Sequence, residues 1–257
     1  MNALNRWLNG IGYLLLIAVN AWAAIMPFGG QTTGEISDKY PTLITPSGYA
    51  FSIWSLIYIL LLLFVVYSFT RRGRQSPVVE VVGYYFLATC VFNVAWLIVW
   101  QLELLEISVF VMLCLLLTLI MVYRRLHSST RMLPTGKERY LVILPFSLYI
   151  GWICVAFIVN IGTVLTARSW DGFGLQDKTW AVIMLTVATL IALALGIRYR
   201  DAMVMLVFVW AFTAISIEQQ AYPVISLNGY VYSAALLIIA ISIGIKYRSA
   251  YRWRLAK

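Results

Sequence analysis

The feature that most constrains this chain is the distribution of charge along it. Long apolar runs alternate with short polar segments, and lysine and arginine collect on every second polar segment. Sixteen of the 19 basic residues lie on this set: Arg6, Arg71, Arg72, Arg74, Arg124, Arg125, Arg131, Lys137, Arg139, Arg198, Arg200, Lys246, Arg248, Arg252, Arg254 and Lys257. The other set holds only Lys39, Arg168 and Lys178. Positive charge on alternate connections is typical of multi-span membrane proteins, whose cytoplasmic loops are the basic ones.

Composition leads to the same class of protein. The chain is 62% hydrophobic and 11% charged, whereas a soluble domain is about 25% charged. Backbone groups in lipid must pair within their own segment, so each apolar run is expected to be a helix of about 20 residues. We therefore predict an all-α polytopic bundle of about eight transmembrane helices in a cell membrane, the plasma membrane of a bacterium, with both termini cytoplasmic. The predicted spans are 10–28, 46–69, 78–101, 105–123, 140–165, 179–197, 201–217 and 229–247.

Two details of this topology stay open. Only Arg198 to Arg200 separates the sixth and seventh spans, so they form either a tight hairpin or one bent pair, which would reduce the count to seven. The start, with Arg6 before the apolar stretch 11–19, imitates a cleavable signal peptide, but the charge alternation requires a retained first span. We divide the chain into a five-helix unit, residues 1–165, and a three-helix module with a basic tail, residues 166–257.

Several functional classes are disfavoured. The net charge of +9 is spread over loops and the tail, where it suits anionic lipid, so membrane lipid and not nucleic acid is the expected partner. The scattered Cys90, Cys114 and Cys154 support neither a disulfide nor a zinc site, and His127 is the only histidine. Because no acid or base lies near the centre of a span, we expect no enzyme, no metal and no cofactor. A homodimer is left open.

Aromatic and amide side chains gather at one depth. From the helix rise of about 1.5 Å per residue, four spans carry them in the outer half of the membrane, beneath a connection at 29–45. The candidate ligand-binding residues are Trp54, Tyr58, Asn93, Trp96, Trp152 and Asn160. Where two or more of these candidate residues lie in one span, they are three, four or eight residues apart, which places them on a common helix face. Asn20 and Gln101 are the other amide side chains within spans.

Each of these features has a plainer interpretation. Trp22, Trp100, Trp170 and Trp180 lie near the outer boundary, and we assign them to an aromatic belt. Trp54, Trp96 and Trp152 lie too deep for a belt, and packing core and ligand pocket remain equal alternatives for them. The 29–45 connection is either a cap that folds back or a solvated linker. A pocket of flat rings with a few amides would suit a large planar apolar ligand.

The same residues carry a family resemblance. Thr45–Tyr58 resembles the segment that opens the second helix of the translocator protein family, also called TspO/MBR or tryptophan-rich sensory proteins. Asn93 and Trp96 resemble its third-helix Asn-x-x-Trp motif, and Pro145 with the Trp152, Ala156 and Asn160 stripe resembles its fifth helix. The similarity covers about residues 10–165. The resemblance implies a five-helix unit that binds porphyrins or other hydrophobic planar or sterol-like molecules in a pocket capped by the first loop.

The chain also departs from this pattern. Gly48 stands where the family has its first pocket tryptophan, and Thr45 replaces the first proline of a pair. Pro145 stands three residues farther from Trp152 than the family spacing, and Trp100-Gln101 replaces the Phe-Phe that ends the third-helix motif. Three further spans follow residue 165, so the chain resembles an extended, divergent member, and a ligand other than the family's is left open.

Two functions remain in competition. The first is a membrane sensor or receptor in which Trp54 and Trp96 stack on a porphyrin-like ligand, while Asn93 and Asn160 bond its polar edge or fix helix packing. The second is a transporter for a small hydrophobic compound, which needs polar residues continuing toward the cytoplasm. Few such residues are present, namely Thr89, Thr118 and Ser147.

Overall fold

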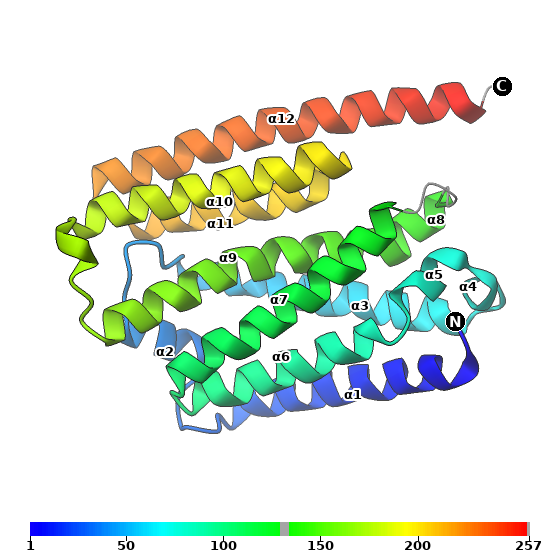
Figure 1. Ribbon diagram of the computed structural model, residues 1–257, viewed down its shortest axis with the longest axis horizontal. Helices are drawn as coiled ribbons and strands as arrows, with labels where there is room; N and C mark the ends of the chain where they lie inside the picture. The colour runs from blue at the N-terminus through cyan, green and yellow to red at the C-terminus, as the bar shows by residue number, and fades with distance from the viewer. Residues whose placement is uncertain (129–133, 256–257) are drawn as a thin grey trace. The chain divides into compact units, whose positions relative to one another are not determined.

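The described part of the chain is helical along most of its length. A computed structural model describes residues 1–128 and 134–255 (Figure 1). Its elements are α1 (Ala3–Ile25), α2 (Thr33–Lys39), the 3₁₀ turn η1 (Gly48–Ser52), α3 (Ile53–Phe69), α4 (Arg71–Gln75), α5 (Pro77–Val82), α6 (Tyr85–Gln101), α7 (Leu105–Ser128), α8 (Gly136–Glu138), the π-helical turn η2 (Arg139–Ile143), α9 (Leu144–Ala167), the 3₁₀ turn η3 (Gly172–Gly174), α10 (Asp177–Tyr199), α11 (Ala202–Glu218) and α12 (Pro223–Leu255). Arg131, Lys257 and the side chains of the tail from Tyr247 onward lie outside the described residues.

The helices of the described chain follow the predicted spans in order, but fewer than eight are long enough to be clear membrane spans. Six segments of the described chain are long and apolar enough to cross a membrane: Ala3–Ile25, Gly48–Phe69, Leu105–His127, Gly136–Ala167, Asp177–Tyr199 and Pro223–Lys246. Two shorter apolar helices, α6 and α11, have 17 residues each. At about 1.5 Å per residue each is about 26 Å long, slightly less than the roughly 30 Å of a bilayer core. The count of eight therefore depends on α6 and α11.

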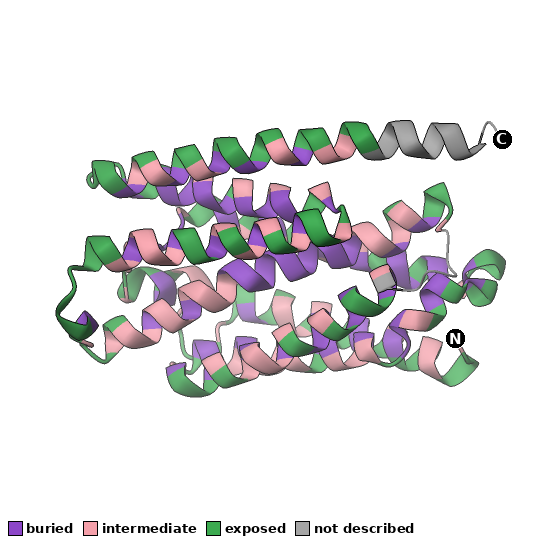
Figure 2. Cartoon of the chain, turned by 45° about the horizontal axis from the view of Figure 1, so that its top comes forward, coloured by how far each residue is buried: buried purple, intermediate pink, exposed green. Residues whose placement is uncertain are grey.

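Much of the apolar surface of these helices points outward. In the most apolar stretches of α1, α10 and α12, only 28% of the residues are buried. Large apolar side chains near the middle of these helices point outward: Leu14 is 67% exposed, Leu190 60% and Ile238 65%. Figure 2 shows exposed residues recurring along the helices. Water would disfavour such surface at about 25 cal/mol per Å², whereas lipid tails would not. The helices are therefore built for an apolar solvent.

The contacts divide the chain into two units. The first comprises Met1–Tyr40 and Phe51–Ile153, where α1 packs on α3 and α6, and α6 packs on α7. The second comprises Pro41–Ala50 and Cys154–Lys257, where α11 packs on α10 and α12. Helix α9 thus contributes to both units, and so does the connection between α1 and α3. The boundary after residue 165 that the sequence predicts stays a prediction.

Helices α10 and α11 form a hairpin and not one bent helix. Arg200 adopts a left-handed conformation with φ of 54°, which ends α10. Asp201 then caps α11, because its Oδ1 accepts a hydrogen bond of 2.9 Å from the backbone N–H of Met203. The two helices approach closely at Gly196, where an added Cβ would lie only 2.3 Å from Sδ of Met205. The small residue in the predicted stripe therefore serves helix packing.

The third predicted span is interrupted. Its sequence, 78–101, predicts one helix, but Gly83 adopts φ of 50° and separates α5 from α6. The conformation leaves the Gly83 carbonyl outside the helical ladder, and Nδ2 of Asn9 donates a 2.8 Å hydrogen bond to it. An apolar run shows no sign of such a break, because the amide that stabilises it lies 74 residues away in the sequence.

Candidate functional site

Trp54, in the first turn of α3, is the centre of an aromatic cluster in the first unit. Its ring contacts four others: Tyr58 with 5.3 Å between ring centroids, Trp96 at 6.5 Å, Tyr149 at 6.0 Å and Trp152 at 6.4 Å. Tyr58 and Trp96 are near-parallel to Trp54, with interplanar angles of 26° and 27°, whereas Tyr149 and Trp152 meet it edge-on. These are the arrangements that ring quadrupoles favour. The structure thus brings together Trp54, Tyr58, Trp96 and Trp152 of the predicted site.

Two more rings extend the cluster. Trp100 stacks on Trp96 with 5.7 Å between centroids, and Phe51 meets Trp152 edge-on at 6.1 Å. The prediction that Trp100 belongs to an aromatic belt is wrong, since its side chain is only 3% exposed and its indole N–H donates to the Thr33 carbonyl at 3.3 Å. Trp22, in contrast, is 55% exposed. The sequence could not distinguish the buried Trp100 from the exposed Trp22, because both lie near a helix end. Which of the two is buried depends on how the connection after α1 folds.

Burial within the cluster is uneven. Tyr149, Trp152 and Trp96 are 0%, 2% and 7% exposed, whereas Trp54 and Tyr58 are partly exposed. The buried indole Nε1 of Trp152 has no hydrogen-bond partner in the described structure. A buried donor without a partner costs about 1–3 kcal/mol, so this N–H is a point at which the cluster can gain by meeting an acceptor.

A network of neutral polar groups lies against the cluster. The Tyr58 hydroxyl donates to Oδ1 of Asn20 at 2.8 Å, and Nδ2 of Asn20 donates to Oδ1 of Asn93 at 3.2 Å. Nδ2 of Asn93 then donates to the Tyr149 hydroxyl at 3.1 Å, and the Tyr13 hydroxyl donates to the Tyr58 carbonyl at 2.9 Å. The network therefore joins α1, α3, α6 and α9 with hydrogen bonds that an apolar environment makes obligatory.

The network bears on the two roles that the sequence left open for Asn93, contact with a ligand and helix packing. Asn93 is 1% exposed, and both ends of its amide have partners within the protein. It is therefore placed to fix helix packing and the orientation of Tyr58 and Tyr149. Asn160, the last predicted residue, is 2% exposed and lies in the second unit.

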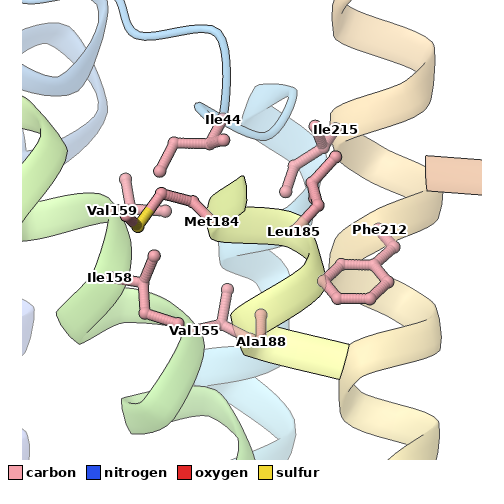
Figure 3. A pocket seen from close by; sticks show the side chains of 9 residues that line it. All are labelled: Ile44, Val155, Ile158, Val159, Met184, Leu185, Ala188, Phe212 and Ile215. Atoms are coloured by element: carbon pink, nitrogen blue, oxygen red, sulfur yellow. The ribbon is translucent and has the colours of Figure 1, made fainter. Parts of the chain in front are cut away.

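The second unit contains one small apolar hollow, formed by α9, α10, α11 and the segment before η1 (Figure 3). Its lining is Ile44, Val155, Ile158, Val159, Met184, Leu185, Ala188, Phe212 and Ile215. The free space is about 10 Å³, roughly the volume needed to admit a single water molecule. A site with no polar lining and so little room is a packing gap and does not fit a planar ligand.

Comparison with known proteins decides the family. The model of the family described as TSPO-like protein matches residues 6–243, from α1 into α12. The chain belongs to the TSPO-like family. It is therefore a multi-pass membrane protein of the TSPO type, and the family match includes the three helices that follow residue 165. No curated protein and no solved structure matches the chain.

The first connection of this TSPO-like protein is an ordered segment and not a plain linker. Gln101, at the end of α6, accepts a hydrogen bond from the Phe28 backbone N–H at 3.0 Å and donates to the Ala23 carbonyl at 3.1 Å. Gly29 lies so close that an added Cβ would be 1.9 Å from the Gln101 carbonyl oxygen. Helix α2 follows, capped by Thr32 and with Ile36 fully buried. Gln101 thus directs the chain from α1 back over the end of α6.

Glu103 holds the far end of α2. Its carboxylate accepts hydrogen bonds from Nζ of Lys39 at 2.7 Å and from the Tyr40 hydroxyl at 2.8 Å. Glu103 itself adopts φ of 54° in the turn between α6 and α7. The bonds from Lys39 and Tyr40 hold the pKa of the Glu103 carboxyl below its usual range, and the bond to Glu103 raises the pKa of Lys39.

We expect Glu103→Gln to loosen α2. A carboxyl whose pKa is lowered on folding stabilises the fold above its unfolded pKa, near 4, and this contribution is lost as the pH falls through the lower folded pKa. Both charged groups are exposed enough for salt to screen them, so the effect is local. A nitroxide label at Gly34→Cys should become more mobile in Glu103→Gln at pH 7, and in the wild type below about pH 4. Glu218→Gln is the control. Equal mobility of the label in the two variants would contradict the conclusion that Glu103 holds α2.

Three residues of the network were not placed in the site from the sequence. Tyr149 precedes Trp152 by three residues, and this spacing puts both on one helix face, so the pattern itself contained the signal. Asn20 stood out only as a polar residue within a span. Tyr13 carried no signal, because a tyrosine in an apolar helix is also typical of a packed core.

Proposed function

We propose that this chain is an eight-span membrane protein with cytoplasmic termini that acts as a sensor or receptor for a hydrophobic planar ligand of the porphyrin type. The family match and the apolar helices support the membrane class. The charge alternation supports the topology. The aromatic cluster in the first unit supports the ligand class, because flat rings recognise flat rings by stacking and by exclusion of solvent.

The observation that carries the proposal is the unpartnered indole N–H of Trp152. This N–H is buried, and the Trp152 ring that carries it meets the rings of Trp54 and Phe51 edge-on. A structural core would gain nothing from a buried donor without a partner. A planar ligand with a carbonyl or carboxylate oxygen would supply the missing acceptor together with a stacking surface.

The proposed roles follow from burial and geometry. Trp54 and Trp96 are near-parallel and would stack on the ligand, while Tyr58, the other partly exposed ring, would border its point of entry. Asn93 would hold Tyr58 and Tyr149 in place. Because the rings pack on one another, ligand binding must separate some of them, so affinity should depend on how easily they move apart.

The direct test replaces Trp152 by phenylalanine. The change keeps a six-membered aromatic ring and removes the five-membered ring with its N–H donor, so the dissociation constant for protoporphyrin IX should rise at least about three- to tenfold, the effect of one hydrogen bond. Tryptophan fluorescence quenching of the purified protein in detergent measures it. Trp22→Phe, at an exposed position, is the matched control. Equal saturable affinity in all three proteins would refute a ligand bound at Trp152.

Neither catalysis nor transport is part of this proposal. The TSPO-like family is generally not enzymatic, and no group of three or more metal-binding side chains lies among the residues searched, those that the structure describes. Transport would require the ligand to cross the bilayer. Uptake of protoporphyrin IX into sealed vesicles containing the protein, above that of empty vesicles, would favour the transporter over the sensor.

A further inference from the structure

Within the second unit, the segment that precedes α3 is bound along one helix, α11. The indole N–H of Trp210 donates to the Ala50 carbonyl at 3.1 Å. The backbone N–H and the hydroxyl of Ser47 both donate to the Ala214 carbonyl, at 3.3 Å and 3.2 Å. Farther along the helix, Nε2 of Gln219 donates to the Thr42 carbonyl at 3.4 Å. Three positions of α11, spaced over about two and a half turns, therefore anchor residues 42–50.

Apolar contacts accompany these bonds. The Tyr49 ring meets Trp210 edge-on with 5.1 Å between centroids. Ile44 and Thr45, in the irregular part of the segment, are 6% and 5% exposed, and Ala50, in η1, is 0% exposed. The segment has hydrogen bonds of its own, from the Thr45 N–H to the Thr42 carbonyl at 3.1 Å and from the Ala50 N–H to the Ser47 carbonyl at 2.9 Å. The bonds from α11 add to these and hold the segment against the helix.

The anchored segment is continuous in sequence with the start of the aromatic cluster. The 3₁₀ turn η1 runs from Gly48 to Ser52, and α3 begins at the next residue. Ala50, held by Trp210, is followed directly by Phe51, whose ring meets Trp152, and Trp54 comes three residues later. Order imposed on Ala50 therefore restricts the backbone that leads into Phe51 and Trp54.

We propose that α11 is a positioning helix for the ligand site: Trp210, Ala214 and Gln219 fix the entry of α3 and thereby tune the affinity of the cluster around Trp54. This inference rests on the proposed function. It gives α11 a task, because this helix holds residues 42–50, from which the chain enters η1 and α3. A ligand that stacks on aromatic rings tolerates little misalignment of those rings. The hydrogen bonds from α11 can therefore change the affinity without touching the ligand.

The test compares two substitutions that each remove one indole-to-carbonyl hydrogen bond from the second unit. Trp210→Phe removes the bond to Ala50 and keeps a ring for Tyr49. Trp180→Phe removes the 2.7 Å bond to the Gly172 carbonyl, which lies in the connection between α9 and α10. Ser47→Ala, which removes only the hydroxyl donor to Ala214, provides a gentler second variant should Trp210→Phe fold poorly.

Two measurements on the full-length protein in detergent decide the matter. Amide hydrogen exchange over residues 47–55 should be about three- to tenfold faster in Trp210→Phe than in the wild type, and unchanged in Trp180→Phe. The dissociation constant for protoporphyrin IX should rise about threefold in Trp210→Phe alone.

The outcomes separate this inference from the proposed function. Wild-type exchange rates over residues 47–55 in Trp210→Phe and in Ser47→Ala would overturn the anchoring by α11. Faster exchange with unchanged porphyrin affinity would overturn the positioning role. A wild-type protein that binds no porphyrin would instead refute the proposed function, and the exchange rates would still show whether α11 fixes the entry of α3.

Discussion

Replacement of both Trp54 and Trp96 by alanine is expected to raise the dissociation constant for protoporphyrin IX more than about a hundredfold. These two near-parallel rings supply the proposed stacking surfaces, and each aromatic pair contributes about 0.5–1.5 kcal/mol beyond the area that it buries. Loss of both rings removes this contribution and most of the apolar area that a planar ligand would cover. Together these losses amount to about 3 kcal/mol or more, which saturation of tryptophan quenching would measure.

The controls for this double variant follow from burial. Trp96 is 7% exposed, and truncation of a buried tryptophan to alanine also costs stability, by about 3–5 kcal/mol in soluble proteins. Trp54→Leu with Trp96→Leu keeps more apolar volume and should show the same loss of binding in a folded protein. Trp7→Ala with Trp22→Ala removes two exposed tryptophans instead. Porphyrin affinity at the wild-type level in a folded leucine variant would show that the cluster is core and not pocket.

The spans were predictable because hydropathy and charge are local properties of the sequence. Each apolar run is helical, although 78–101 is divided at Gly83. The sequence left a hairpin or one bent pair open around Arg198 to Arg200, and the left-handed conformation of Arg200 makes it a hairpin. The exact ends were not predictable. Helix α12 begins at Pro223, six residues before the predicted start, since proline is readily accommodated at the first position of a helix. The break at Gly83 depends on Asn9, and no local pattern records that contact.

The site was predictable to the extent that it follows helix periodicity. Asn93 and Trp96 share a face because they are three residues apart, and the structure indeed places both beside Trp54 or its partners. Periodicity cannot show which polar group bonds to which, so the link from Asn93 to Tyr149 emerged only from the packed helices. The anchoring of Ser47 to Ala214 joins residues 167 positions apart. Such a contact between an irregular segment and a helix has no periodicity to detect.

Asn93→Ala should lower the free energy of unfolding by about 1–3 kcal/mol. Hydrogen bonds between membrane helices average about 0.6 kcal/mol and reach about 1.7 kcal/mol, and Asn93 bonds to both Asn20 and Tyr149. Its loss leaves an Asn20 donor and the fully buried Tyr149 hydroxyl without these partners. Reversible unfolding in mixed micelles with increasing SDS measures the change.

Asn228→Ala is the matched control for this variant. Asn228 is partly exposed, and its amide donates to the Val224 carbonyl of its own helix, so its replacement should change the unfolding free energy by less than about 0.5 kcal/mol. An equal effect in the two variants would mean that the network does not join the helices. A large loss for Asn93→Ala alone would show that this amide holds α1, α6 and α9 together. The hydrogen-bond network would then align the rings of the cluster without contacting the ligand itself.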